Sequence, residues 1–278
     1  MGFMDKVRNG WKICELSLEV LRSNKKLIIF PMISCIALFI IISSFVFGFG
    51  YFNNWHFEQL NDPDHYIKRY SFTFLIYLIS YTVVIFFNIA LMHCVRLYFE
   101  DKEVSLSIGI KYSVSRLGYI LSWALFASTV GLILKIIQDN VGKLGKILVG
   151  FLGIAWGVST FFVVPILAYE NKTPWNALKE SISMMKKLWG ESLTAGFSFG
   201  ILQLCAVVVF LLVSFIVGLA NIYLGIALFI LGMVLTSSVF SALNSIFISA
   251  VYTKVSTDID VKQFSATDVN QLFESKKK

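Results

Sequence analysis

Charged residues are scarce in this chain. They make up 15% of its 278 residues, while hydrophobic residues make up 57%, and an ordinary soluble domain carries about 25% charged residues. The composition therefore excludes a water-covered surface over most of the chain. No Asp or Glu lies deep in any of the long apolar runs, whereas transporters coupled to protons or cations commonly rely on such a carboxylate. That absence argues against a secondary transporter.

Proline and cysteine are also sparse. Four prolines are compatible with long helices, because proline interrupts a helix interior. The four cysteines show no CxxC spacing, so we expect neither a zinc site nor a disulfide framework. We expect the cysteines to act as small apolar packing residues. These cysteines are Cys14, Cys35, Cys94 and Cys205.

Motifs that carry chemistry are missing too. The chain has no serine nucleophile elbow, no P-loop and no Rossmann fingerprint, so we expect no enzyme and no cofactor. Two histidines and two aspartates fall within one segment, at His56, Asp62, Asp64 and His65. The Asn-Asp-Pro-Asp stretch inside it is typical of a turn, and we expect no metal site there.

Six long apolar runs, separated by short charged stretches, fill most of the chain. About 20 apolar residues suffice for a helix to cross the hydrocarbon core of a membrane, and a helix satisfies its backbone hydrogen bonds within its own segment. The predicted fold class is therefore all-α: a polytopic membrane protein with six transmembrane helices in three hairpins. It would form a single domain over 1–254, followed by a cytoplasmic tail over 255–278. The expected spans are 27–49, 72–97, 117–137, 147–169, 193–219 and 222–252.

Basic residues are distributed unevenly between the two sides of these spans. Nineteen of the 24 Lys and Arg fall before the first span, after the second and fourth spans, or in the tail, and five fall on the other side. Cytoplasmic segments carry an excess of Lys and Arg. Both termini are therefore predicted to be cytoplasmic in a multi-pass protein of the cell (inner) membrane. The first run is too long for the apolar region of a cleavable signal and is expected to stay as an anchor.

The segments before the first and fifth spans have apolar residues at alternating steps of three and four, which places them on one helix face. In the later segment these include Leu178 and Met185. Such helices lie in the membrane interface, where neighbouring basic side chains reach lipid phosphates. The expected interfacial helices are 3–22, 104–116 and 174–189, although the middle segment also fits an extended conformation. The residues expected at the lipid interface are Trp11, Lys12, Arg22, Trp175, Lys179, Lys186, Lys187 and Trp189.

The same segments indicate an internal repeat. Laying Trp11 on Trp175 also places Ser17 on Ser181. In addition, the second and fourth spans both end in aromatic-Glu-(Asp/Asn)-Lys, seventy residues apart. An interfacial helix followed by a two-span hairpin is therefore predicted to occur three times in parallel orientation.

Trp11, the 25–34 entry into the first span, and the Tyr169-Glu170-Asn171-Lys172 exit with the helix after it resemble an uncharacterised family of six-span bacterial membrane proteins. The resemblance covers most of the chain, and it implies fold and location without implying an activity. The layout is also loosely similar to the membrane domain attached to some glycerophosphodiester phosphodiesterases. The soluble catalytic barrel of those enzymes has no counterpart in this sequence.

Polar residues inside spans are candidate functional residues, because each is costly in lipid unless it faces protein or water. Those of the second and sixth spans would line a polar seam if their stripes face each other. The alternative is hydrogen bonding between helices, with the arginine reaching cytoplasmic phosphates. The seam candidates are Asn88, His93, Arg96, Ser237, Ser241, Asn244 and Ser245.

Small residues and one proline also stand out within the spans. Gly153 with Gly157, and Gly196 with Gly200, have GxxxG spacing. This spacing permits close approach of helices, so helix packing is their expected role. Pro165 lies near the end of the fourth span and is expected to kink it.

These features predict a non-enzymatic integral membrane protein that organises the membrane or handles lipid, and that engages anionic lipid through cytoplasmic interfacial helices. A small channel or permease through the seam of spans two and six is the alternative, and an intramembrane enzyme comes third. The expected partners are membrane lipids with anionic headgroups. A second copy of the chain or another membrane protein stays open as a partner. No nucleic acid is expected, because the basic residues that give the net charge of +7 lie beside the spans, where they meet the membrane.

Overall fold

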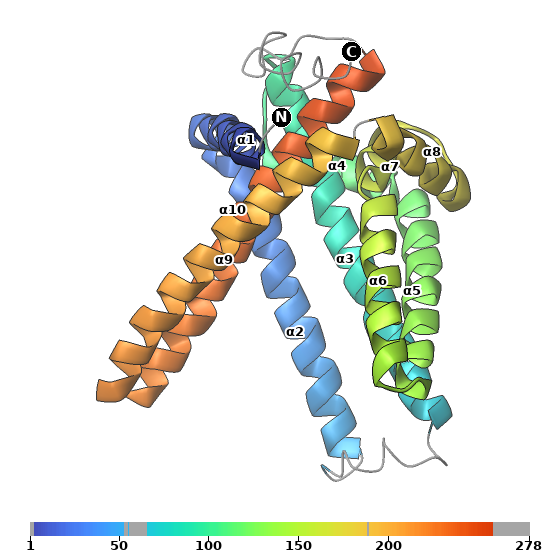
Figure 1. Ribbon diagram of the computed structural model, residues 1–278, viewed down its shortest axis with the longest axis vertical. Helices are drawn as coiled ribbons and strands as arrows, with labels where there is room; N and C mark the ends of the chain where they lie inside the picture. Colours follow the sequence, from blue (N-terminus) through green and yellow to red (C-terminus); the bar gives the residue numbers. More distant parts are fainter. Residues whose placement is uncertain (1–2, 53–54, 56–65, 188, 258–278) are drawn as a thin grey trace. The chain divides into compact units, whose positions relative to one another are not determined.

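The computed structural model describes residues 3–52, 55, 66–187 and 189–257, and every regular element in these ranges is helical (Figure 1). Some of the predictions fall outside the described part of the chain and stay predictions. They concern the side chains of Lys12, Lys187 and Trp189, the surroundings of Gly196, the four residues His56, Asp62, Asp64 and His65, and the tail from residue 258.

The helices follow one another along the chain. In order they are α1 (Phe3–Ser23), η1 (Lys25–Ile28), α2 (Ile29–Phe52), α3 (Tyr66–Phe99), α4 (Leu106–Ser115), α5 (Leu117–Asn140), α6 (Lys143–Ser159), α7 (Val163–Tyr169), α8 (Pro174–Lys187), α9 (Trp189–Ala220) and α10 (Ile222–Thr257).

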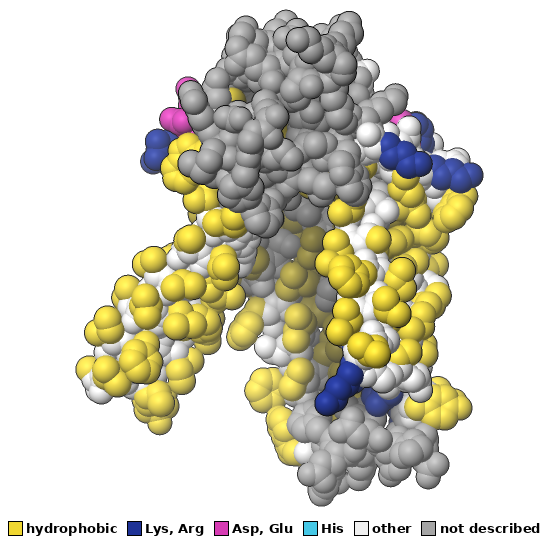
Figure 2. Space-filling model, in the orientation of Figure 1, with side chains coloured by type: hydrophobic (Ala, Val, Ile, Leu, Met, Phe, Trp, Pro, Cys, Tyr) yellow, Lys and Arg dark blue, Asp and Glu magenta, His cyan; other side chains and the backbone are white. Residues whose placement is uncertain are grey.

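Six stretches of the described helices are long and apolar enough to cross a membrane: η1 with α2, α3, α5, α6 with α7, α9, and α10. Figure 2 shows hydrophobic side chains along these stretches, with Lys and Arg gathered near their ends. Apolar side chains on the outside of a helix are tolerated where lipid surrounds it. The predicted all-α class and the six apolar spans are confirmed.

One compact unit contains Met1–Met32, Ala90–Lys111 and Met184–Lys278. Within it α9 and α10 pack against each other, and α1 packs on both (Figure 1). The core lies in the second half of α10, where Ala242 and Ile246 are completely buried. The halves of α9 and α10 next to their connection are apolar and exposed.

The other compact unit contains Ile33–Ile89 and Tyr112–Ser183. Its helices α5 and α6 pack side by side, joined by a short turn, and α7 and the start of α8 lie at one end of this pair (Figure 1). The start of α3 packs on the end of α5, where Tyr77 closely faces Gly131. The charged groups described below lie at the two ends of these helices.

The middle one of the three predicted interfacial segments is helical. Ser105 caps α4, since its Oγ accepts a hydrogen bond from the Ile108 N–H at 3.3 Å. One turn later, a Cβ on Gly109 would lie 2.6 Å from Phe30 and 2.9 Å from Cys94, so the helix packs closely through this glycine. The alternating apolar residues, which also fitted an extended conformation, are overridden by the cap and by this packing.

The fourth span is broken rather than merely kinked. One helix with a kink at Pro165 was predicted over 147–169, but α6 ends at Ser159 and α7 begins at Val163. Proline has no N–H to donate to the carbonyl four residues earlier, and its ring crowds that carbonyl. The helix therefore stops on the N-terminal side of the proline. Thr160 Oγ1 donates to a carbonyl one turn earlier, at 2.9 Å.

Labelling of single cysteines in intact cells would test the predicted orientation. Asn176 lies exposed on α8 and Lys143 lies exposed at the opposite end of α6. We expect Asn176→Cys to react with a membrane-impermeant maleimide only after permeabilisation, and Lys143→Cys to react in intact cells, because the more basic side faces the cytoplasm. The opposite pattern would show that the orientation is reversed.

Candidate functional site

Helix α8 has one face buried in the protein and one face exposed. Leu178 and Met185, predicted to meet lipid, are 7% and 2% exposed and pack inside the protein instead. Trp175 is 55% exposed, and Lys179 and Lys186 are exposed as well. Among the described side chains of α8, the exposed face therefore carries one aromatic ring and two ammonium groups.

Two polar contacts fix α8 to the end of the fourth span. The backbone N–H of Phe162, in the turn between α6 and α7, donates to Ser181 Oγ at 3.0 Å. Lys172 Nζ pairs with Glu170 at 2.5 Å and also pairs with Glu180 of α8. Hydrogen bonds from the ammonium to Glu170 and Glu180 raise the pKa of Lys172, so this cation stays charged at neutral pH. Helix α8 is thus held in place by the chain itself.

An aromatic cluster lies between α5, α6 and α8. The indoles of Trp123 and Trp156 stack with their centroids 6.0 Å apart. Phe126 lies 5.5 Å from the first of these rings and 6.1 Å from the second. Trp175 meets Phe126 edge to face at 6.3 Å, and the Lys179 ammonium lies 5.4 Å from the Trp175 ring centroid. The exposed tryptophan of α8 is therefore continuous with the apolar surface of the spans.

Both copies of the repeated exit motif form the same ion pair. Glu100 lies 2.6 Å from Lys102, and the corresponding distance between Glu170 and Lys172 is 2.5 Å. In the first copy Arg96 also donates to Glu100, at 3.0 Å. The hydrogen bond from Lys102, together with the one from Arg96, lowers the pKa of the Glu100 carboxyl. Such partly exposed pairs contribute little stability, but their shared geometry agrees with the predicted repeat.

A second polar contact joins α4 to the end of α7. Tyr112 Oη donates to the Ala168 carbonyl at 2.5 Å. The Arg116 guanidinium lies 5.6 Å from the ring centroids of both Tyr112 and Tyr119, and it donates to Asn171 Oδ1 at 2.6 Å. In the sequence, Arg116 stands out only as one of the basic residues after the second span, which are predicted to be cytoplasmic. No local pattern pairs residues this far apart in the chain.

Helix α1 resembles α8 in its exposed residues. Trp11 is 59% exposed and Arg22 is exposed, whereas Val20 is completely buried. Ser17, which the repeat places on Ser181, is also completely buried, but its hydroxyl has no hydrogen-bond partner among the described residues. The two helices therefore share an exposed tryptophan and differ in how their buried serine is used.

The predicted seam residues fall in two units. Ser237, Ser241 and Asn244 are partly buried on α10 and Ser245 is buried. Helix α10 shares its unit with the part of α3 that holds His93 and Arg96, while Asn88 belongs to the other unit. Arg96 is engaged with Glu100, as described above.

Three of the four predicted packing glycines have open space around them in the described chain. A Cβ added at Gly153, Gly157 or Gly200 would have no neighbour within 4 Å. The close contact between α9 and α10 is made elsewhere. A Cβ on Gly225 would lie 2.6 Å from the Cα of Gly218. GxxxG spacing therefore did not identify the glycines at which these two backbones approach.

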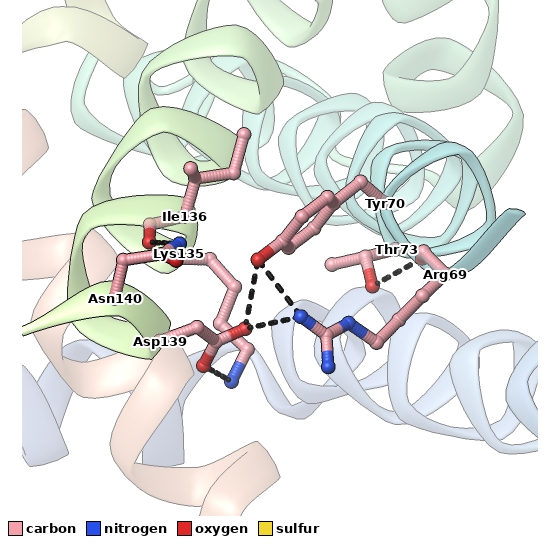
Figure 3. A network of polar contacts seen from close by, with 7 residues as sticks. All are labelled: Arg69, Tyr70, Thr73, Lys135, Ile136, Asp139 and Asn140. Atoms are coloured by element: carbon pink, nitrogen blue, oxygen red, sulfur yellow. Dashed lines mark hydrogen bonds and ion pairs between the residues drawn. The ribbon is translucent and has the colours of Figure 1, made fainter. Parts of the chain in front are cut away.

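A network of charged and polar groups lies where α3 begins and α5 ends (Figure 3). Arg69 Nη2 donates to Tyr70 Oη at 2.8 Å and lies 3.5 Å from Asp139 Oδ2. Tyr70 Oη donates to the same carboxylate oxygen at 3.5 Å, and Lys135 Nζ lies 2.8 Å from Asp139 Oδ1. The spacing of Lys135 and Asp139 by four residues was a signal for their ion pair. Nothing in the sequence indicated Arg69 as the third member.

Six apolar spans in an all-helical chain, with basic and aromatic groups at their ends, define a polytopic α-helical membrane protein. The chain belongs to a family of unknown function (DUF6159), whose model matches residues 67–260. The matched part runs from α3 to α10 and includes α8 and the network of Figure 3. No curated protein matches the chain.

Proposed function

We propose that this protein is a non-enzymatic lipid-handling or membrane-organising component that engages anionic lipid at the cytoplasmic face. The observation that carries the proposal is the exposed surface of α8. Trp175 is exposed with the Lys179 ammonium over its ring, on a helix whose other face is fixed to the fourth span through Ser181.

The chemistry of that surface suits the headgroup region. Trp175 contacts Phe126 of α5, and the neighbouring Leu121 and Leu125 of α5 are exposed apolar residues. An indole between an apolar span and a basic group is typical of the membrane interface. Lys179 and Lys186 are seven residues apart and so lie two turns apart on one side of α8. Each would attract acidic lipid by about 1 kcal/mol near the surface.

The finer architecture belongs to the same proposal. Helices α1, α4 and α8 precede α2, α5 and α9 in the chain, and α5 with α6 and α9 with α10 are packed pairs. These facts support hairpins that are each preceded by an interfacial helix. The excess of Lys and Arg on one side of the spans supports cytoplasmic termini, and a bacterial inner membrane is part of the same proposal. The proposed partners are membrane lipids with anionic headgroups, together with a second copy of the chain or another membrane protein.

Lipid retention by the purified protein would test the role of α8. We expect Lys179→Gln with Lys186→Gln to weaken retention of phosphatidylglycerol about 25-fold, since each lost charge corresponds to about fivefold. Trp175→Ala should lower retention of phosphatidylglycerol and phosphatidylcholine alike, because the ring contributes apolar contact. Native mass spectrometry of the variants in mixed micelles measures both effects.

The matched control removes the same charge at the other end of the spans. Lys143→Gln should leave retention through α8 unchanged. Asn88→Ala and His93→Ala should have milder effects than the α8 variants. If those two changes abolished the cellular phenotype while the α8 variants were silent, the channel or permease alternative would take precedence.

A further inference from the structure

A groove runs along α3 beside the network of Figure 3 and has no part in the function proposed above. Its volume is about 620 Å³, within the range of about 300–1,000 Å³ that is common for ligand sites. Tyr66, Tyr70, Phe74 and Leu75 line it from successive turns of α3, and Leu132 lines it from α5. Aromatic and aliphatic groups therefore form most of its walls.

The length of the groove matches one leaflet of a membrane. Tyr66 and Leu75 are nine residues apart, which corresponds to about 14 Å along a helix. Half of the hydrocarbon core is about 15 Å thick. Because the groove begins at the first residue of α3, at the end of a span, an acyl chain lying in it would run from the headgroup region towards the middle of the bilayer.

One side of the groove adjoins the charged network of Figure 3 through Tyr70. Tyr70 belongs to both features, since its ring lines the groove and its hydroxyl contacts Arg69 and Asp139. The side chains of Arg69 and Lys135 are 30% and 40% exposed, whereas that of Asp139 is 22% exposed. An approaching anion would therefore meet the two cations more readily than the carboxylate that they share.

Unused donors and nearby charges point the same way. Arg69 Nε is buried and has no hydrogen-bond partner among the described residues. In the described part of this unit, the ends of α3, α5 and α6 on this side carry one carboxylate, that of Asp139, and five basic residues. The five are Lys68, Arg69, Lys135, Lys143 and Lys146.

We propose that this groove binds an anionic glycerophospholipid. One acyl chain lies along α3 between Tyr66 and Leu75, and the phosphate is bound by Arg69 and Lys135. Asp139 pairs with both cations and lowers the net charge of the three groups to +1, so its carboxylate competes with the phosphate for them. The site lies at the opposite end of the spans from α8. Lipid binding in the groove can therefore be tested independently of lipid binding at α8.

Binding of phosphatidylglycerol and phosphatidylcholine to the purified full-length chain tests the site. We expect Lys135→Gln and Arg69→Gln each to weaken binding of phosphatidylglycerol at this site about fivefold. The effect on phosphatidylcholine should be smaller, because its choline cation offsets the charge of its phosphate. Ser71→Trp should fill the groove and abolish binding of both lipids here. Lys111→Gln and Leu121→Trp are matched controls outside the groove and outside this group of basic residues, and each should leave binding at the groove unchanged.

Asp139→Asn separates a lipid site from a purely structural ion pair. Loss of this carboxylate removes an anion that competes with the phosphate, so we expect tighter binding of phosphatidylglycerol, by about fivefold, together with a lower thermal midpoint. Weaker binding in this variant would overturn the proposal. Equal binding of the two lipids, displacement of the lipid by inorganic phosphate alone, or dimerisation that is lost on Ser71→Trp without lipid binding would overturn it too.

Discussion

Replacing Gly225 by valine is expected to separate α9 from α10. A Cβ at this position would lie 2.6 Å from the Cα of Gly218, 2.9 Å from its N and 2.8 Å from the carbonyl oxygen of Ser214. All three are backbone atoms, which cannot rotate away as a side-chain end could. Overpacking of this kind costs about 1–3 kcal/mol or more. We expect a lower thermal midpoint in detergent and faster proteolysis between the two helices.

A second glycine of the same hairpin provides the control. Gly200 also lies in α9, but a Cβ there would meet no atom within 4 Å. Gly200→Val should therefore keep the wild-type thermal midpoint. It is a matched control, because it changes the same residue type in the same kind of helix. An equal loss of stability in both variants would show that intrinsic helix preference, rather than the close approach at Gly225, governs the hairpin.

Removing the hydroxyl of Ser181 is expected to loosen the contact between α8 and the broken fourth span. Ser181 is completely buried, and its Oγ accepts the N–H of Phe162, which is also completely buried. Ser181→Ala would leave that N–H without an acceptor, at a cost of about 1–3 kcal/mol. We expect a lower thermal midpoint and faster hydrogen exchange at the Phe162 amide.

Ser183→Ala is the matched change for this test. Ser183 lies two residues further along α8 and is exposed, so its loss should change neither quantity. Ser181→Thr keeps an acceptor and should restore slow exchange at the Phe162 amide, whatever its effect on packing. Unchanged exchange in Ser181→Ala would mean that the break between α6 and α7 satisfies this amide without α8.

The contact at Ser181 also bears on the function that we propose. Trp175 and Lys179, which we propose to engage lipid, lie on the same helix as the Ser181 hydroxyl that reaches into the break. A displacement of α8 would therefore also move the turn between α6 and α7, where the fourth span is broken. If α8 engages lipid as proposed, Ser181→Ala should weaken lipid retention through loss of the fixed platform, while leaving the charges of Lys179 and Lys186 intact.

The sequence by itself determined the class of fold. A run of about 20 apolar residues can be recognised from the sequence without knowledge of the tertiary structure. In lipid such a run forms a helix that crosses the membrane, because only internal hydrogen bonds satisfy its backbone. The amphipathic period of α1 and α8 could be read in the same way. So could the repeated exit motif, which forms the same ion pair at Glu100 and at Glu170.

Tertiary structure alone decided which groups meet. Ser181 with Phe162, Tyr112 with Ala168 and Arg69 with Asp139 are separated by 19, 56 and 70 residues, and no local period joins them. The burial of Leu178 and Met185 of α8 could not be predicted from the sequence either, because an apolar stripe can pack on protein as well as on lipid. Close approach of helices also depends on the partner backbone, which is why Gly225 makes the tight contact while Gly153 and Gly157 have open space around them.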